Sequence, residues 1–235
     1  MLSQQNPADA LRLNKYLAGK LAIGRRQVDT LIEKGRVRVN GEQPSLGARV
    51  RPTDVITIDG QPVTQQATPF IYLALHKPVG YVCSRTQQGD APTVYSLLPD
   101  GYQHLKTVGR LDKDSSGLLL LTNDGDFAHR MTHPSFVKVK RYEVTLDKPL
   151  QPLHHQMIND HGIVLPDGPS RLALERIAEG DGTRWSVIMH EGRNRQIRRT
   201  FAALGYGVTG LHRVQFGNYR LGDNQPGRFW LVEKQ

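Results

Sequence analysis

The chain has 235 residues, with 31 lysines and arginines against 22 aspartates and glutamates, and its formal net charge is +9. That length suits one mid-sized domain with a small appendage, and the basic excess favours a nucleic-acid partner through attraction to phosphates. The single cysteine, Cys83, excludes an internal disulfide, and no apolar run reaches the ~20 residues that a membrane-spanning helix needs.

Residues 1–10 are polar and are predicted to be disordered, and they lack the apolar core of a signal peptide, so we expect a cytoplasmic protein. Asp9 can cap a helix that starts near Ala10, in which Leu13, Leu17 and Leu21 share one face. A second helix is predicted over 26–34, followed by short strands near 37–39 and 55–58. Residues 11–60 therefore predict a small α/β domain.

This first domain holds more than half of the chain's excess positive charge. Residues 11–60 contain ten basic and five acidic residues, a net charge of +5. Five of the basic residues surround the second helix: Arg25, Arg26, Lys34, Arg36 and Arg38. They are candidates for RNA phosphate contacts, and the alternative is an ordinary solvated charged face.

Residues 61–69 are polar and bounded by proline, so they are predicted to be a linker to a larger domain over 70–235. Strands are predicted near 70–75, 79–84, 117–122, 140–146, 184–190, 208–216 and 229–232. Helices are predicted near 125–131, 150–161 and 193–204. The expected fold class is α+β, with a mixed, mainly antiparallel sheet flanked by helices.

One loop of this larger domain combines a carboxylate with basic neighbours. Asp112 follows Arg110 in a Gly- and Ser-rich stretch, directly before the apolar run 118–121, which is predicted to be a buried strand. A rigid sheet holds such a loop in place, and an adjacent arginine favours the ionised carboxylate that a nucleophile or base requires. The alternative interpretation is a surface turn with a structural ion pair.

The stretch GRLDKDSSGLLLLTNDG, residues 109–125, resembles the catalytic motif of the RsuA/RluB-type family of ribosomal RNA pseudouridine synthases. Further matches follow in the family's order at 75–80 (LHKPVG), 140–144 (KRYEV) and 191–199 (EGRNRQIRR). Residues 11–60 resemble the small S4-like RNA-binding domain that is shared with a ribosomal small-subunit protein. The resemblance spans nearly the whole chain.

The resemblance implies a catalytic domain with a central cleft and assigns roles to several residues. Asp112 is the expected catalytic carboxylate, and Tyr142 is the aromatic platform for a uridine flipped out of its stack. Arg198 is expected to form an ion pair with Asp112, and Ile197 is expected to line the uracil pocket. Arg110 is a further candidate for substrate binding. The remaining arginines of the last motif are candidates for phosphate contacts or structural support: Arg193, Arg195 and Arg199.

The implied partner is ribosomal RNA, in free form or in pre-ribosomal particles, and the implied reaction uses neither cofactor nor metal. His129 and His133 lack the accompanying ligands of a metal site. Members of the family act on either 23S or 16S rRNA, and we expect 23S rRNA to be the substrate of this chain. A non-catalytic RNA-binding ribosome-assembly factor is the alternative from another class, and a monomer is the default state.

Overall fold

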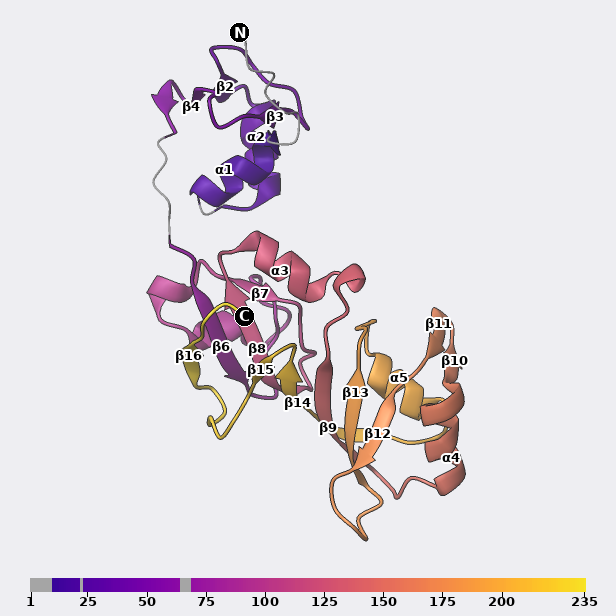
Figure 1. The fold of residues 1–235 in the computed structure, drawn as a ribbon. Coiled ribbons are helices and arrows are strands. Elements are labelled where there is room, and N and C mark those ends of the chain that lie inside the picture. The colour runs from indigo at the N-terminus through magenta and orange to yellow at the C-terminus, as the bar shows by residue number, and fades with distance from the viewer. Residues whose placement is uncertain (1–9, 22, 64–68) are drawn as a thin grey trace. The chain divides into compact units, whose positions relative to one another are not determined.

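The computed structural model describes residues 10–21, 23–63 and 69–235, and the chain forms two compact units, Met1–Phe70 and Ile71–Gln235 (Figure 1). The predicted cap Asp9, the predicted disordered N-terminus up to residue 9, and most of the predicted linker lie outside the described residues.

The N-terminal unit is built on two short helices, α1 (Leu13–Leu21) and α2 (Arg25–Glu33). Leu13 and Leu17 are four residues apart on one face of α1, and both are buried in the core of the N-terminal unit, while Leu21 is only partly buried. α1 begins at Leu13 rather than near Ala10, because Leu11–Arg12 (β1) pairs with Arg49–Val50 (β3) instead of continuing the helix.

A three-stranded antiparallel sheet completes this unit. β2 (Val37–Val39) pairs with β4 (Ile56–Ile58), and β4 pairs with β5 (Gln61–Pro62). The first two residues of the predicted linker therefore belong to this sheet. The core of the unit consists of Leu13, Leu17, Ala18, Val28, Ile32, Val37, Val50 and Ile56.

The C-terminal unit is organised around a sheet to which its described residues contribute nine strands, mostly antiparallel. Seven of them run in the order β12-β13-β9-β14-β8-β6-β16, while β15 pairs with β14 and β7 pairs with β8. The bounds are β6 Tyr72–Lys77, β7 Lys106–Val108, β8 Ser116–Thr122, β9 Lys140–Leu146, β12 Ala173–Arg176, β13 Arg184–Met189, β14 Val208–Phe216, β15 Tyr219–Arg220 and β16 Phe229–Leu231. Among the described strands, only β14 and β8 are parallel neighbours, so the sheet is mixed and mainly antiparallel, which confirms the predicted fold class.

The four leucines of β8 are buried on both faces of this sheet. Leu118 and Leu120 pack with α3 (Gly125–Thr132) through Phe127 and Met131. Leu119 and Leu121 belong to the larger cluster on the other face, with residues of β9, β13 and α5 (Gln196–Ala202). A continuous apolar run is the pattern expected of a strand that is covered on both sides.

Helices cover both faces of the sheet, as Figure 1 shows for α3 beside β7 and for α4 and α5 beside β12 and β13. α4 (Pro152–Gln156) continues into a π-helical turn over Met157–His161, so the helix predicted for 150–161 is present in two forms. A hairpin of β10 (Ile163–Leu165) and β11 (Gly168–Ser170) follows.

Several predictions of secondary structure were wrong. Residues 79–84 form no strand and make only an isolated bridge between Val82 and Thr93, because positive φ at Gly80 turns the chain away from the sheet after β6. In the C-terminal unit, β7, β10, β11, β12 and β15 were not predicted, and each of them has four residues or fewer. α5 begins three residues later than predicted, because Arg195 is left-handed, with φ of +47°.

Candidate functional site

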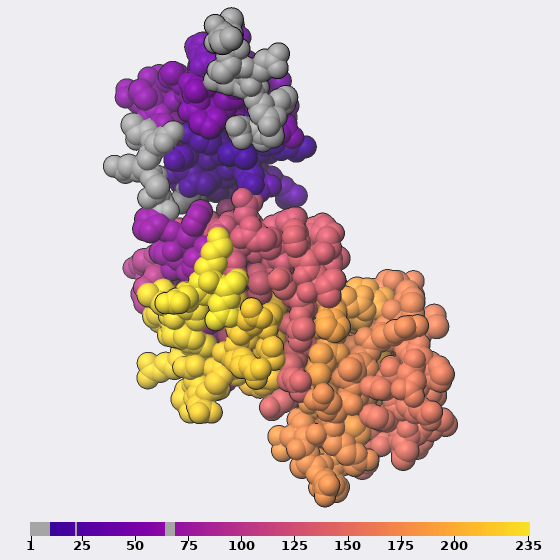
Figure 2. Space-filling view, viewed as in Figure 1, coloured from indigo at the N-terminus to yellow at the C-terminus, as the bar shows by residue number. Residues whose placement is uncertain are grey.

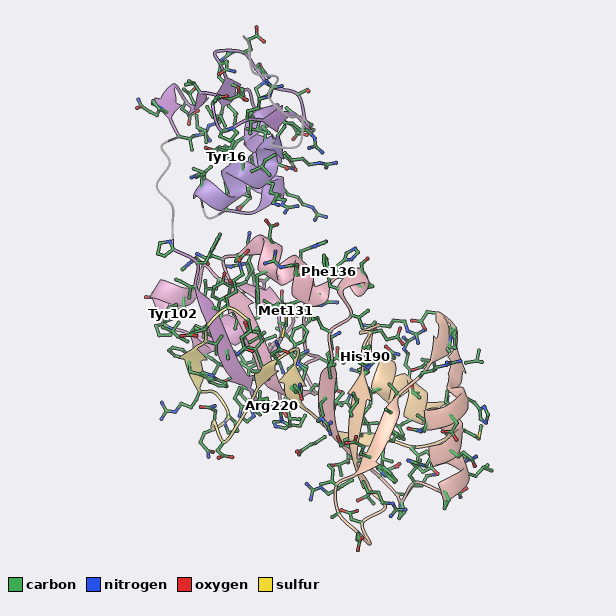
Figure 3. All side chains as sticks on the ribbon, in the orientation of Figure 1. Tyr16, Tyr102, Met131, Phe136, His190 and Arg220 are labelled. Atoms are coloured by element: carbon green, nitrogen blue, oxygen red, sulfur yellow. The ribbon has the colours of Figure 1, made fainter. Side chains whose placement is uncertain are left out.

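A pocket of about 430 Å³ lies in the C-terminal unit where the loop before β8, strands β9 and β14, and the segment between β13 and α5 meet. It brings together six of the predicted site residues: Arg110, Asp112, Tyr142, Arg193, Arg195 and Ile197. Met131 of α3 and His190 after β13, both labelled in Figure 3, also line it. In the space-filling view, the surface of β9 forms a narrow band between the yellow C-terminal strands and the orange segment around β12 and β13 (Figure 2).

The loop that carries Asp112 is anchored on both sides of the carboxylate. Leu111 is buried, and its N–H lies 3.4 Å from Cys83 Sγ. The N–H of Ser115 donates to the Asp112 carbonyl at 3.1 Å, which closes a turn. The Asp112 side chain remains one-third exposed at the pocket. Asp112 is therefore held by its neighbours and open to a ligand.

The arginine beside the Asp112 carboxylate is Arg195, not Arg198 or Arg110. Arg195 Nη1 lies 3.5 Å from Asp112 Oδ2, and the same guanidinium donates to both oxygens of Asp114 at 3.2 Å. Arg195 immediately precedes α5 in a left-handed conformation, which a non-glycine residue adopts rarely. That backbone turn aims its side chain back at the Asp112 loop.

Arg198 departs from the expected ion pair. Its Nη2 donates to the Asp114 carbonyl at 2.9 Å and lies 3.3 Å from Asp114 Oδ2, while its Nη1 donates to the Val208 carbonyl at 2.7 Å. Partial burial opposes ionisation of Asp114, but the hydrogen bond from Arg195 and the charge of Arg198 lower its pKa. Arg198 thus fastens the Asp112 loop to α5 through contacts with Asp114.

Arg193 and Arg199 both donate hydrogen bonds to the β10–β11 hairpin. Arg193 donates to the carbonyls of Asp167, Gly168 and Pro169 at 2.8–3.0 Å. Arg199 forms two hydrogen bonds with the Asp167 carboxylate, at 3.0 and 2.7 Å. Both guanidiniums hold this hairpin against the start of α5, which favours the structural role over phosphate binding.

Tyr142 and Ile197 are buried walls of the pocket. Tyr142 is 8% exposed on β9, and Ile197 is 4% exposed on the first turn of α5. An aromatic ring and an aliphatic side chain at one pocket provide the apolar surfaces that a planar base needs for stacking.

In the N-terminal unit, the five predicted RNA-binding residues are all exposed. Arg36 is held by an ion pair with Asp59, on the strand turn after β4. Among the described residues, the side chains of Arg25, Arg26, Lys34 and Arg38 have no ion-pair partner within 4.0 Å. Their contact with RNA stays a prediction.

Four charged residues that line the pocket were not singled out from the sequence: Lys138, Lys140, Glu191 and Arg213. Lys140 and Arg213 both line it, although Arg213 is 2% exposed. Lys140 lies in the KRYEV motif, which was a usable signal. Arg213 lies in a predicted strand, where a charged residue is normally placed on the solvent face, and no local pattern distinguishes it.

Comparison with known proteins identifies the family. The model of the RNA pseudouridylate synthase family matches residues 71–203, and the model of the S4 domain matches residues 11–56. The chain is 37% identical to a ribosomal small subunit pseudouridine synthase A of Pasteurella multocida over 91% of each chain. It is 36% identical to a ribosomal large subunit pseudouridine synthase B of Shigella flexneri, covering 93% of this chain and 78% of the relative.

A crystal structure of a pseudouridylate synthase matches with a TM-score of 0.68 and 31% identity, covering 95% of this chain and 96% of the other. The chain belongs to the RNA pseudouridylate synthase family, and it carries an S4 domain. It is a pseudouridine synthase, an isomerase, which confirms the resemblance to the RsuA/RluB type.

The described residues contain no group of three or more histidine, cysteine, aspartate or glutamate residues placed to hold a metal ion. No helix among them is both long and apolar enough to cross a membrane.

Proposed function

We propose that this pseudouridine synthase converts a uridine of ribosomal RNA, with Asp112 as its catalytic carboxylate. The observation that carries the proposal is the single pocket in which an anchored, accessible Asp112 lies together with Tyr142 and Ile197. A protein that only binds RNA has no use for an accessible carboxylate there, because the negative charge repels the phosphates of the ligand.

The reaction breaks the bond from the ribose to N1 of uracil, turns the base, and rejoins it through C5, which loses its proton. Tyr142 and Ile197 hold the detached base by stacking and apolar contact, which contributes on the order of 1–3 kcal/mol per base for an aromatic platform. Arg195 orients the Asp112 carboxylate through its 3.5 Å ion pair. Arg110, on the pocket rim, contacts the RNA strand that carries the flipped uridine.

Ribosomal RNA is supported by the relatives, whose names assign them to the small or the large ribosomal subunit at nearly equal identity. The stretches at 124–135 and 192–199 resemble those of large-subunit members of the family, so we favour 23S rRNA as the target, with 16S rRNA as the second candidate. The basic N-terminal unit raises affinity for a structured element of that RNA through phosphate contacts.

The test is tritium release from RNA labelled at C5 of uracil, using 16S and 23S transcripts and immature subunits as substrates. We expect release by the wild-type protein from one of the two RNAs. Asp112→Asn keeps the shape of the side chain but removes the charge, and we expect release to fall below detection, a loss of more than about 1,000-fold.

Asp90→Asn is the matched control, because Asp90 is an exposed carboxylate outside the pocket; it should retain full activity. Release by Asp112→Asn at the wild-type rate would contradict the role of Asp112. Absence of release from every RNA by a wild-type protein that binds them would instead favour the assembly-factor function.

A further inference from the structure

Lys140 and Arg213 are two cations on the wall of the pocket, close to Tyr142. Lys140 precedes Tyr142 by two residues on β9, and Arg213 is the direct cross-strand partner of Tyr142 on β14. Among the described residues, neither cation has a carboxylate oxygen within 4.0 Å. They therefore differ from Arg193, Arg195, Arg198 and Arg199, each of which is paired with an aspartate.

Arg213 is buried with part of its hydrogen-bonding capacity unused. Its Nε donates to the Leu118 carbonyl at 2.8 Å, and its guanidinium carbon lies 4.8 Å from the centre of the Phe216 ring. Its Nη2 is buried without a hydrogen-bond partner among the described residues. A buried donor without an acceptor is costly, and a charged one more so.

Lys140 places a second positive charge on the same ring. Its Nζ donates to the Glu191 carbonyl at 3.0 Å and lies 5.5 Å from the centre of the Phe216 ring. Burial and the charge of Arg213 lower the pKa of Lys140, against a smaller opposing effect of Glu191. An anion bound beside both groups offsets this repulsion and favours the charged form of Lys140.

A bulge in β14 places these groups together. The register with β9 shifts between Arg213 and Gln215, so Phe216 lies opposite Lys140 and lines the same pocket as Arg213. In a regular strand, residues three apart point to opposite faces. The bulge therefore brings the Phe216 ring close to both cations.

We propose that Lys140 and Arg213 form an anion site that holds a backbone phosphate adjoining the flipped uridine. This rests on the proposed function and names which part of the substrate these residues recognise. Uracil is neutral and calls for no pair of cations, whereas each phosphodiester carries one negative charge and oxygens that accept hydrogen bonds from guanidinium and ammonium groups. A phosphate held there fixes the sugar of the target nucleotide near Asp112.

The test combines protein variants with a chemically neutralised phosphate. The substrate is a short rRNA fragment containing the converted uridine, made with a methylphosphonate at its 5′ or its 3′ side. We expect one of the two substitutions to lower kcat/KM of the wild-type protein by about 10- to 100-fold, the loss of charge-assisted hydrogen bonds. Arg213→Gln and Lys140→Gln should show a similar loss on the natural fragment.

The decisive measurement is the loss of kcat/KM when a protein variant acts on the methylphosphonate substrate, compared with the loss from either change alone. With the variants, the methylphosphonate at the sensitive position should cause no more than about a twofold further loss, because the contact has already been removed. Arg220→Gln is the control for charge, since Arg220 is exposed on β15 and outside the pocket (Figure 3); it should respond to the methylphosphonate as the wild type does.

If the losses in kcat/KM from the variant and from the methylphosphonate multiply, Lys140 and Arg213 act through packing alone and the proposal is wrong. The proposal is also wrong if neither methylphosphonate lowers kcat/KM of the wild-type protein. A binding measurement keeps the test independent of turnover: uridine 3′,5′-bisphosphate should bind the wild type at least about tenfold more tightly than uridine does. Lys140→Gln, at a less buried position than Arg213, should abolish that preference. If no RNA is converted, the proposed function fails, and the bisphosphate titration still decides the anion site.

Discussion

The carboxylate of Asp124 begins α3 and joins three parts of the C-terminal unit. Its Oδ1 accepts hydrogen bonds from the N–H groups of Asp126 and Phe127 at 3.0 and 2.9 Å, as an N-cap does. Its Oδ2 accepts from the Tyr72 hydroxyl and from Lys234 Nζ, both at 2.8 Å. Burial favours the neutral acid, but these donors prevail and lower the pKa of Asp124 from 3.8 to about 2.

Asp124→Asn should therefore destabilise the C-terminal unit at neutral pH. The pKa shift corresponds to about 2 kcal/mol of stability when the side chain is ionised. Because the folded-state pKa is depressed, this stability is present above pH 3.8 and is lost as the pH falls to about 2. Urea unfolding of both proteins between pH 7 and pH 3 measures the effect.

The difference between wild type and Asp124→Asn should shrink below pH 4, and Asp90→Asn should match the wild type throughout. A difference that stays constant down to pH 3 would show that lost cap geometry, and not the ionised charge, accounts for the destabilisation.

The arginines of the last motif illustrate what residue patterns can predict. A helix near 193–204 was predicted, and the structure buries its apolar residues Ile197 and Phe201 in the core. The partner of each arginine was not predicted. The left-handed backbone of Arg195 redirects the chain, so that Arg195, and not the expected Arg198, lies beside Asp112. No spacing rule reports a single backbone dihedral angle.

At the scale of elements, the contact between β8 and β14 positions the pocket. Gly117 has φ of +107°, and a Cβ there would lie 2.3 Å from the Arg213 carbonyl oxygen and 2.5 Å from its nitrogen. These strands form the parallel pair, with Gly117 opposite Arg213. A glycine is therefore required for the strand of the Asp112 loop to approach the strand that carries Arg213.

Gly117→Ala should destabilise the C-terminal unit by about 2–4 kcal/mol, because the strands must separate and the residue is strained at positive φ. Gly125→Ala is the matched control at the first residue of α3, where a Cβ meets no atom within 4 Å; its stability should equal or slightly exceed that of the wild type. Denaturant midpoints compare the three proteins. Equal midpoints for Gly117→Ala and wild type would contradict the close approach.

At the scale of the whole molecule, charge is distributed unevenly along the chain. Residues 11–60 hold a net charge of +5 out of +9, and exposed arginines on and near α2 contribute to it. An RNA contact made by such residues releases counterions and becomes weaker as the salt concentration rises.

Replacing Arg25, Arg26 and Arg38 together by glutamine should weaken RNA binding while kcat at saturating RNA is retained. If each contacts a phosphate, the slope of log K against log salt should fall by about 0.7–0.9 per residue, or roughly two to three in total. Arg36→Gln is the control, because its partner Asp59 already occupies that guanidinium; it should change the slope less than one of the free arginines. An unchanged slope in the triple variant would exclude this face from the RNA contact.

The sequence by itself predicted the class of fold, the buried strand at 118–121 and the helix near 193–204, because apolar periodicity reports which side of an element is buried. The candidates Asp112, Tyr142 and Ile197, which line one pocket, came from the resemblance of short motifs to those of the family. Only the tertiary structure decided the partners of the charged side chains. Arg195 meets Asp114 across 81 residues of sequence, and Arg213 lies in the pocket through a bulge and a glycine contact between neighbouring strands. Such pairings depend on strand register and on individual backbone angles, which act over long separations in the chain and leave no periodic trace in it.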